Sequence, residues 1–362
     1  MISSPPGHLV EIEGKRYLNF SSNNYLGLAD NPLLKKSAGE AIEKYGVGSG
    51  ASRLISGTIT IHRLLEGKIA RFKGEEEAMV FSSGYLANLG VIPALVGRGD
   101  AVILDRLNHA SIIDAARLSQ ARIFVYPHAD TKGLEKVLKR TASFPRRLVV
   151  TDTLFSMDGD IAPLPEILGL CRHYQSLLMV DEAHATGLFG KRGSGLVEEY
   201  GLSGKIDIVM GTMSKALGSL GGYVSGQKTI IEYLRQYART YIYTTSLPAS
   251  LAAASLAAID YIEKNKERRE EFWQRIERVR TGLLALGYNL LNSRTQIIPV
   301  LIGQVDKTIL IEKYLFEQGL FIPAIRPPTV PRGSSRLRIS LMATHREEHL
   351  DRLLTTFTLL AG

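Results

Sequence analysis

Short apolar runs recur through most of the chain and are separated by stretches of mixed polarity. Each run is four or five residues long and bounded by turn-forming residues, which is typical of buried strands. The runs lie at residues 78–81, 101–104, 122–126, 148–151, 177–180, 206–210 and 222–225. Between them, stretches such as residues 60–73 carry apolar side chains three and four positions apart, which predicts helices. The alternation predicts an α/β fold whose sheet consists mainly of parallel strands.

The two ends of the chain show other patterns. Residues 9–12 and 16–20 alternate in polarity around a Glu-Gly-Lys turn, which predicts a hairpin. Near the C-terminus, two strands and two helices are predicted at residues 296–302, 306–318, 336–342 and 345–360. The charged stretch 264–278 marks a boundary before them. We therefore expect an N-terminal hairpin segment (1–30), a large α/β domain (31–260) and a C-terminal α+β domain (261–362).

Composition narrows the class of protein. Hydrophobic residues make up 45% and charged residues 22% of the 362 residues, as in ordinary globular enzymes. The single cysteine, Cys171, excludes an internal disulfide and fits a reducing compartment. The N-terminus shows no signal-peptide pattern, and the alanine-rich run 247–259 is shorter than the roughly 20 apolar residues that span a bilayer. We expect a cytoplasmic protein without membrane association.

The formal net charge of +8 is the one unusual bulk feature. Nucleic-acid binding is disfavoured because the basic residues are spread along the chain rather than gathered into a tract with interleaved aromatics. A basic surface also favours acidic metabolites as ligands. No Cys/His cluster has metal-ligand spacing, so no metal site is predicted.

Lys215 is the centre of the predicted chemistry. It follows the run 206–210 and lies among small residues and glycines, where an ammonium group is poorly solvated and its free amine becomes available. A free amine can form a Schiff base with an aldehyde. A solvated loop lysine is the alternative, but Asp181 ends the preceding apolar run. A lysine for the aldehyde and a buried aspartate for the pyridinium nitrogen suit pyridoxal phosphate.

Other polar residues follow the same kind of run. The Ser82-Ser83-Gly84 turn before a helix offers free N–H groups for a phosphate, although Ser83 could equally be a plain N-cap. Ligands of such sheets bind at the carboxyl ends of the strands. The candidates at those ends are Ser83, His109, Ser156, Asp181, His184 and Lys215. Arg336 and Arg338 share one side of a C-terminal strand and could bind a carboxylate, or could simply face solvent.

Five motifs together resemble the α-oxoamine synthases. They are NHAS at 108–111, FSMDGD at 155–160, DEAHA at 181–185, GTMSKALG at 211–218 and RPPTVP at 326–331. The resemblance runs from about residue 9 to the end of the chain. It implies the aspartate-aminotransferase fold (fold type I), in which a large domain with a mostly parallel seven-stranded sheet binds pyridoxal phosphate and a small α+β domain follows. It also implies a homodimer that condenses an amino acid with an acyl thioester and releases CO2.

The resemblance implies a role for each matching residue. Lys215 would hold the cofactor and move the Cα proton, Asp181 would pair with the pyridinium nitrogen, and His109 would stack on the ring. Further cofactor contacts would come from Gly84, Tyr85 and Thr212 near the phosphate, from Ser156 and His184 near the phenolic oxygen, and from Thr244 and Thr245 toward the phosphate in the partner subunit. Substrates would meet Asn24 and Arg338 at the carboxylate and Thr329 at the acyl group.

The family branch closest to this chain condenses L-alanine with a pimeloyl thioester, carried by coenzyme A or acyl carrier protein, to 8-amino-7-oxononanoate in biotin biosynthesis. Glycine acetyltransferases and 5-aminolevulinate synthases are alternatives, but they usually carry Gly where this chain has Ser214 and lack RPPTVP. Serine palmitoyltransferases can share the serine but also lack RPPTVP. We expect no contacts to the acyl chain from the leading helix and arginine that the family usually has. A binding module without enzymatic activity is the most distant alternative.

Overall fold

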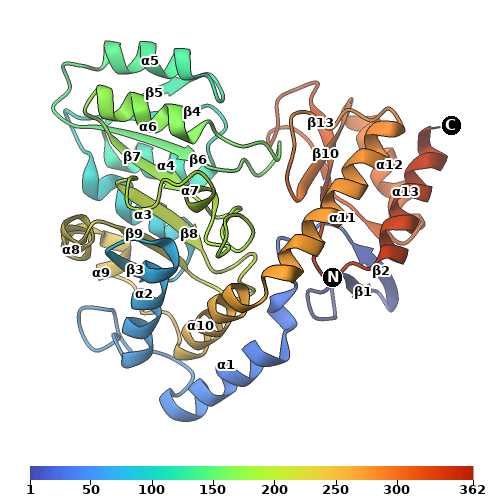
Figure 1. The fold of residues 1–362 in the computed structure, drawn as a ribbon, viewed down its shortest axis with the longest axis horizontal. Helices are drawn as coiled ribbons and strands as arrows, with labels where there is room; N and C mark the ends of the chain where they lie inside the picture. Colours follow the sequence, from blue (N-terminus) through green and yellow to red (C-terminus); the bar gives the residue numbers. More distant parts are fainter. Residues whose placement is uncertain (362) are drawn as a thin grey trace. The chain divides into compact units, whose positions relative to one another are not determined.

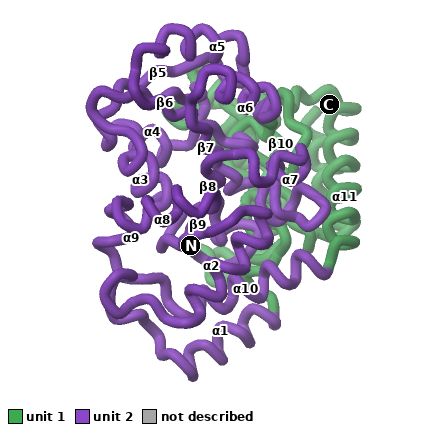
Figure 2. The backbone as a smooth tube through the Cα atoms, turned by 60° about the vertical axis from the view of Figure 1, so that its left-hand side comes forward, with its two compact units in different colours: residues 1–31, 156–161, 265–362 green, residues 32–155, 162–264 purple. Residues whose placement is uncertain are grey.

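The computed structural model describes residues 1–361, which form two compact units (Figures 1 and 2). The smaller unit comprises residues 1–31, 156–161 and 265–361, and the larger unit comprises residues 32–155 and 162–264. The N-terminal hairpin thus groups with the C-terminal residues, whereas the sequence predicts it as a separate segment. The division into three domains stays a prediction. Within residues 1–361, no helix combines the length and apolarity needed to cross a membrane.

A seven-stranded sheet forms the core of the larger unit, in the order β3-β9-β8-β7-β6-β4-β5. Its strands are β3 (Glu77–Phe81), β4 (Ala101–Asp105), β5 (Arg122–Tyr126), β6 (Arg147–Asp152), β7 (Leu177–Asp181), β8 (Ile208–Thr212) and β9 (Gly222–Gly226). β9 pairs antiparallel with β3 and β8, and all other pairs are parallel. The predicted α/β fold with a mostly parallel seven-stranded sheet is confirmed.

β8 ends two residues later than its apolar run predicts. Gly211 and Thr212 pair with Tyr223 and Gly222 of β9, so the ladder of the β8–β9 hairpin extends past the last apolar side chain. A glycine is required at 211 because a Cβ there would lie 2.2 Å from the Tyr223 hydroxyl oxygen. The start of the lysine motif therefore belongs to the strand, which carries it to the edge of the sheet.

The larger unit also contains helices (Figure 1). They are α1 (Pro32–Tyr45), α2 (Thr60–Lys73), α3 (Gly84–Leu95), α4 (Ala110–Ser119), α5 (Thr131–Arg140), α6 (Leu164–His173), α7 (Leu196–Glu199), α8 (Lys228–Tyr237), α9 (Arg239–Ile242) and α10 (Ala249–Lys264). α3, α4 and α8 bury Val91, Ile112 and Ile231 against the strands. Each such side chain contributes about 1.5–3 kcal/mol relative to an exposed one. This core holds the start of α3 firmly beside the strand ends.

The smaller unit contains two three-stranded sheets and three α-helices. β1 (Leu9–Ile12), β2 (Lys15–Asn19) and β11 (Leu320–Phe321) form one sheet, and β10 (Ile297–Gly303), β13 (Ser335–Ser340) and β12 (Ala324–Ile325) form the other. Its helices are α11 (Lys266–Ala285), α12 (Val305–Glu317), α13 (Glu347–Ala361) and the short 3-10 helix η1 (Leu28–Asp30). Residues 266–278 of the charged stretch are part of α11, since Phe272, Ile276 and Val279 give this helix one buried face.

Candidate active site

A cavity of roughly 230 Å³ lies at the carboxyl ends of the parallel strands of the larger unit. Its walls come from the starts of α3 and α4, the ends of β6, β7 and β8, and the loop after β8. The cavity brings together eight predicted site residues: Ser83, Gly84, Tyr85, His109, Asp181, His184, Thr212 and Lys215. Residues far apart in the sequence thus converge at the carboxyl ends of the strands, where ligands of such sheets bind.

Lys215 lies in a tight turn after β8. The turn is closed by the Met213 backbone N–H and by Thr212 Oγ1, which donate to the Gly221 carbonyl at 2.9 Å and 2.8 Å. Gly221 has a φ of 127°, and a Cβ there would lie 2.4 Å from Met213 Cε, so this position requires glycine. The turn directs the Lys215 side chain to His184, with Nζ 2.8 Å from Nε2.

Asp181 ends β7 and is 3% exposed. Its carboxylate accepts hydrogen bonds from Asn88 Nδ2 at 3.0 Å and from the Ala183 backbone N–H at 2.9 Å. Asn88 also donates to Ser111 Oγ at 2.9 Å, so α3 and α4 both help to orient the carboxylate. The sequence prediction missed Asn88. Its signal is a single amide within the otherwise apolar stretch 86–95, where a buried polar group needs partners.

His109 is the N-cap residue of α4. Its Nδ1 accepts from the Ser111 backbone N–H at 3.2 Å, which assigns the ring proton of the neutral form to Nε2. Burial lowers the pKa of His109, and the positive charge of Lys215 adds to this, whereas the negative charge of Asp181 opposes it. The net effect favours a neutral imidazole with a fixed ring plane, which suits stacking on a flat ligand.

Asp152 ends β6 directly beside Asp181 in the sheet register, and sequence reasoning missed it. Burial and the neighbouring Asp181 charge raise the pKa of Asp152 well above its usual value. This shift favours the protonated form of Asp152 beside the Asp181 carboxylate. Asp152 Oδ2 accepts the His109 backbone N–H at 2.9 Å and so also fixes the start of α4. Its signal is its place after the run 148–151, which matches the place of Asp181 after 177–180.

The start of α3 forms an anion-binding cradle. Ser83 is the N-cap, and its Oγ accepts from the Leu86 backbone N–H at 3.2 Å. The amides of Gly84 and Tyr85 in the first turn have no hydrogen-bond partner in residues 1–361. A Cβ on Gly222 would lie 2.4 Å from the Ser83 carbonyl oxygen, so bare backbone of β9 supports the turn. Ser83 therefore caps the helix while the amides that follow stay available for a phosphate.

Two predicted phosphate contacts are engaged elsewhere through their side chains. The Tyr85 hydroxyl donates to Asp114 Oδ2 at 2.6 Å, toward α4. Thr212 Oγ1 donates to the Gly221 carbonyl in the lysine turn. At Tyr85, the backbone amide rather than the hydroxyl is therefore available to a ligand.

The donor set of this cavity fits pyridoxal phosphate. The free amides and the positive dipole end of α3 suit a phosphate, and the Lys215 amine suits an aldehyde. The Asp181 carboxylate suits a pyridinium nitrogen, and the neutral His109 ring offers a flat face. The crowding at Gly222 is consistent with this fit, because any side chain there would displace the helix start that receives the phosphate.

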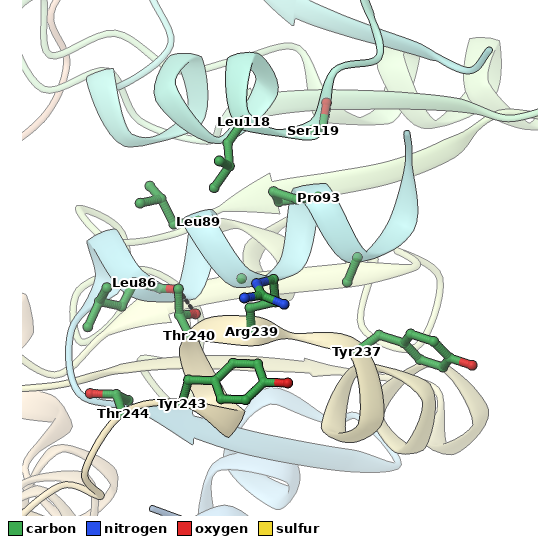
Figure 3. Close-up of a pocket in the computed structure, with 12 residues that line it drawn as sticks. Leu86, Leu89, Pro93, Leu118, Ser119, Tyr237, Arg239, Thr240, Tyr243 and Thr244 are labelled. Carbon is green, nitrogen blue, oxygen red and sulfur yellow. Dashed lines mark hydrogen bonds between the residues drawn. The ribbon is translucent and has the colours of Figure 1, made fainter. Parts of the chain in front are cut away.

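Thr244 and Thr245 do not line the cavity around Lys215. Thr244 borders a second cavity of roughly 550 Å³ between α3, α4 and α9, whose lining is mostly apolar (Figure 3). Thr245 pairs with Ser52 in an isolated β-bridge. Tyr243, labelled beside Thr244 in Figure 3, is 71% exposed. Their expected contact with a partner subunit stays a prediction.

Four predicted residues belong to the smaller unit: Asn24, Ser156, Thr329 and Arg338. Arg338 is 5% exposed, so the alternative of a solvent-facing arginine is wrong. Its Nε donates to the Ser156 carbonyl at 2.6 Å and its Nη2 to Asn23 Oδ1 at 3.1 Å. Thr329 is exposed in its loop. Arg336 is equally buried and is bound by Asp158 and the Met157 carbonyl.

Asn23, rather than Asn24, is the asparagine beside Arg338. The Asn24 side chain donates to the Pro6 carbonyl at 3.0 Å and accepts from the Ala29 backbone N–H at 3.2 Å, which holds its loop together. Nothing in the sequence separates two adjacent asparagines, because only the local backbone decides which one faces the arginine. The geometry therefore favours Asn23 as the partner of Arg338.

Comparisons with known proteins agree with this geometry. The model of the family "Aminotransferase class I and II" matches residues 15–357. An 8-amino-7-oxononanoate synthase from Geobacter metallireducens is 50% identical over 353 residues, covering 97% of this chain and 90% of that protein. A solved structure of SPT with PLP as internal aldimine has a TM-score of 0.96 at 35% identity and covers 100% of this chain and 92% of that chain.

A solved 8-amino-7-oxononanoate synthase from Francisella tularensis has a TM-score of 0.83 at 28% identity and covers 95% of this chain and 97% of that chain. Sequence and structure thus point to the same family, as the motifs predicted. The chain belongs to the aminotransferase class I and II family and, within it, to the α-oxoamine synthases.

Proposed function

We propose that the protein is a pyridoxal-phosphate-dependent acyltransferase that condenses L-alanine with a pimeloyl thioester to give 8-amino-7-oxononanoate, CO2 and the free thiol. The observation that carries the chemistry is the meeting of the Lys215 amine, the Asp181 carboxylate and the free start of α3 in one small cavity. The half-identical relatives named 8-amino-7-oxononanoate synthase support the choice of substrates.

The cofactor, when bound, supplies an electron sink for negative charge at the amino-acid Cα. Asp181 would keep a proton on the ring nitrogen, and Asn88 orients that carboxylate. The Lys215 amine, held against His184, removes and returns the proton at Cα. The start of α3 would hold the phosphate, and the His109 ring would cover one face of the cofactor. His184 and Ser156 would contact the phenolic oxygen side.

The smaller unit supplies the proposed substrate contacts. Arg338 binds the amino-acid carboxylate, because its guanidinium is always charged and its fork matches two oxygens. Asn23 adjoins Arg338 and takes the role first assigned to Asn24. Thr329 and its proline-rich loop border the acyl group, and a stiff loop favours one chain length. We also propose a homodimer in which Thr244 and Thr245 reach the cofactor phosphate of the partner subunit.

Absorbance and a substrate panel test this function. The purified protein should be yellow, and L-alanine should change its spectrum at lower concentration than glycine or L-serine. Acetyl, succinyl, pimeloyl and palmitoyl thioesters, offered on coenzyme A and on acyl carrier protein, should then show turnover mainly with pimeloyl. A colourless protein that takes up no pyridoxal phosphate would contradict the proposal.

Serine palmitoyl transfer is the second candidate, because the SPT structure superimposes with a TM-score of 0.96. The same panel separates the two functions. Preference for L-serine with the palmitoyl thioester would assign the chain to that branch, and preference for glycine with a short acyl group would assign it to a glycine-using branch.

A further inference from the structure

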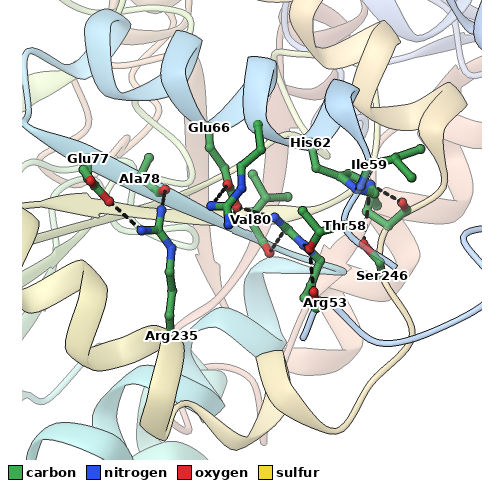
Figure 4. A network of polar contacts seen from close by, with 12 residues as sticks. Arg53, Thr58, Ile59, His62, Glu66, Glu77, Ala78, Val80, Arg235 and Ser246 are labelled. Carbon is green, nitrogen blue, oxygen red and sulfur yellow. Dashed lines mark hydrogen bonds and ion pairs between the residues drawn. The ribbon is translucent and has the colours of Figure 1, made fainter. Parts of the chain in front are cut away.

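Two arginine–glutamate pairs flank strand β3 in the larger unit (Figure 4). In the inner pair, Arg53 Nη2 lies 2.7 Å from Glu66 Oε1, and both side chains are almost completely buried, at 3% and 4% exposed. Burying two charges is unfavourable unless further hydrogen bonds satisfy them. The inner pair has such bonds, and they lead to two parts of the proposed phosphate site.

The first set of bonds reaches the strand that enters α3. Arg53 Nη1 donates to the Val80 carbonyl at 3.3 Å, and Glu66 Oε1 accepts the Val80 backbone N–H at 3.2 Å. The ion pair therefore holds both backbone groups of Val80. Ser83, the N-cap of α3, follows only three residues later. Arg53 and Glu66 thereby help to fix the position of the start of α3 relative to strand β3.

The second set fixes the segment that contains Thr244 and Thr245. Arg53 Nε donates to Thr58 Oγ1 at 2.9 Å, which closes the loop 52–58. The preceding residue, Ser52, forms the β-bridge with Thr245. The Ser246 backbone N–H donates to the Ala51 carbonyl at 3.0 Å.

The segment is also bound directly to the helix start and to α2. Ser82 Oγ donates to the Thr245 carbonyl at 3.2 Å, next to the α3 cap. His62 of α2 accepts the Ile59 backbone N–H on Nδ1, so its neutral ring carries the proton on Nε2 and donates to the Leu247 carbonyl at 2.6 Å. Figure 4 shows part of this network, including Arg53, Glu66 and His62.

We propose that Arg53, held by Glu66, is a positioning residue for phosphate binding, although it touches no cofactor itself. It sets the start of α3 and the Thr244–Thr245 segment in register with each other. Both elements serve a phosphate in the proposed function: the first within its own chain and the second in the partner subunit. The inference rests on that function and adds a residue for which the sequence motifs gave no role.

The outer pair provides a matched control. Arg235 Nη1 lies 2.6 Å from Glu77 Oε2, and Arg235 Nη2 donates to the Ala78 carbonyl at 3.0 Å. It is an arginine–glutamate pair on the same strand, but it joins β3 to α8 and binds neither the loop 52–58 nor the helix start. A general loss of β3 stability would appear with Arg235 variants as well.

The experiment compares pyridoxal phosphate with pyridoxal, which lacks the phosphate but retains the aldehyde. Dissociation constants of both are measured by absorbance titration of the full-length apoenzyme for the wild type, Arg53→Lys, Glu66→Gln and Arg235→Lys. We expect Arg53→Lys to weaken pyridoxal phosphate about tenfold, because a lysine cannot form the forked contacts. Its affinity for pyridoxal should change by less than about twofold. Glu66→Gln keeps the acceptor oxygen. It should therefore change the ratio of the two dissociation constants in the same direction as Arg53→Lys, but by less.

Arg235→Lys should leave the ratio of the two constants unchanged. Equal losses for pyridoxal phosphate and pyridoxal in both inner-pair variants would overturn the inference, as would a control variant that loses phosphate preference to the same extent. If Arg53→Lys does not fold, Glu66→Gln decides the question by itself. A wild-type protein that binds neither compound would overturn the proposed function and the inference with it. Wild-type binding with an unchanged preference in both inner-pair variants would overturn the inference alone.

Discussion

Two lysines of the larger unit contact neighbouring residues of the same short segment, yet their surroundings differ in kind. Lys73 Nζ lies 2.6 Å from Glu182 Oε2, and Lys215 Nζ lies 2.8 Å from His184 Nε2. Lys73 also donates to Thr186 Oγ1 and to the Ser194 carbonyl, so its three ammonium protons all have acceptors. Lys215 meets an imidazole nitrogen at the wall of a cavity.

The comparison shows that burial alone does not make a lysine reactive. Burial by itself lowers the pKa of Lys73, but the negative charge of Glu182 more than offsets this, and the net pKa is raised. Lys73 therefore stays an ammonium ion and links the end of α2 to Glu182, Thr186 and Ser194. Lys215 contacts the His184 imidazole and borders a cavity that a ligand can fill.

Lys215→Ala should have the largest effect. The variant loses both the attachment point of the cofactor and the group that moves the Cα proton, so turnover should fall by up to about 10⁴-fold. Borohydride reduction of the wild type followed by peptide mapping should place the cofactor on Lys215. Lys73→Met serves as the control and should still be labelled at Lys215. A label mapped to Lys73 in the wild type would reverse the roles assigned to the two lysines.

Asp181→Asn should have the next largest effect. The amide cannot hold a proton on the pyridine nitrogen, so cofactor should still bind while turnover falls by about 10- to 100-fold, the range of a charge-assisted hydrogen bond. Absorbance reports binding, and an assay with L-alanine and pimeloyl thioester reports turnover. Near-normal turnover would remove Asp181 from this role and leave the pair with Asp152 as a structural feature only.

Lys73→Met should act on stability rather than on chemistry. It leaves the Glu182 carboxylate unpaired in a site with 0% exposure, and breaking a buried ion pair in this way costs about 3–5 kcal/mol. The thermal unfolding midpoint should therefore fall clearly. The double variant Lys73→Met with Glu182→Gln should recover much of the loss, since it leaves no unpaired charge. Equal midpoints for wild type and Lys73→Met would contradict the structural role.

Glu75, near the Lys73–Glu182 pair, should give the smallest effect, and it depends on pH. Burial is the main reason why the pKa of Glu75 rises from 4.5 to about 7. Below pH 4.5 the carboxyl is protonated in both the folded and the unfolded state, so it contributes no difference. As pH rises toward 7, only the unfolded state releases the proton, and the folded state becomes less stable.

Glu75→Gln mimics the protonated form and should remove this pH dependence. Its unfolding midpoint should match the wild type in acid and exceed it above pH 7. Midpoints measured across the pH range would show the two curves separating as pH rises. A gap that is widest in acid would mean that the carboxylate is stabilising.

Sequence patterns located the reactive residues because polar residues that follow apolar runs are expected at the carboxyl ends of strands. This expectation needs only the order of the runs along the chain. Lys215, Asp181 and His109 each follow such a run, and the structure brings them together. Asn88 and Asp152 were missed because their importance comes from neighbours on other elements. The sequence prediction placed Asn24 with Arg338 at the substrate carboxylate, whereas the asparagine that contacts Arg338 is Asn23. Side-chain direction in an irregular loop depends on backbone contacts such as that of Asn24 with Pro6.

The contacts of Lys73 and Arg53 lie beyond any pattern in the sequence. Each joins a helix or loop in the first quarter of the chain to elements that follow later, and a buried charge leaves no periodic trace. The position of β9 in the sheet is a similar case. A short run with glycines at both ends predicts a strand, but not that it inserts between β3 and β8.

That insertion has a consequence for how the protein is made. β3 joins the sheet only through β9, because Phe81 pairs with Gly222 and no other strand of the sheet adjoins β3. During synthesis the first strand of the sheet must therefore wait, unpaired at the edge that leads into α3, until the β8–β9 hairpin has emerged. The start of α3, which follows β3, and the Lys215 turn between β8 and β9 are then brought together in one late step. Until translation has passed residue 226, the unpaired edge of β3 in the nascent chain needs protection from other strands.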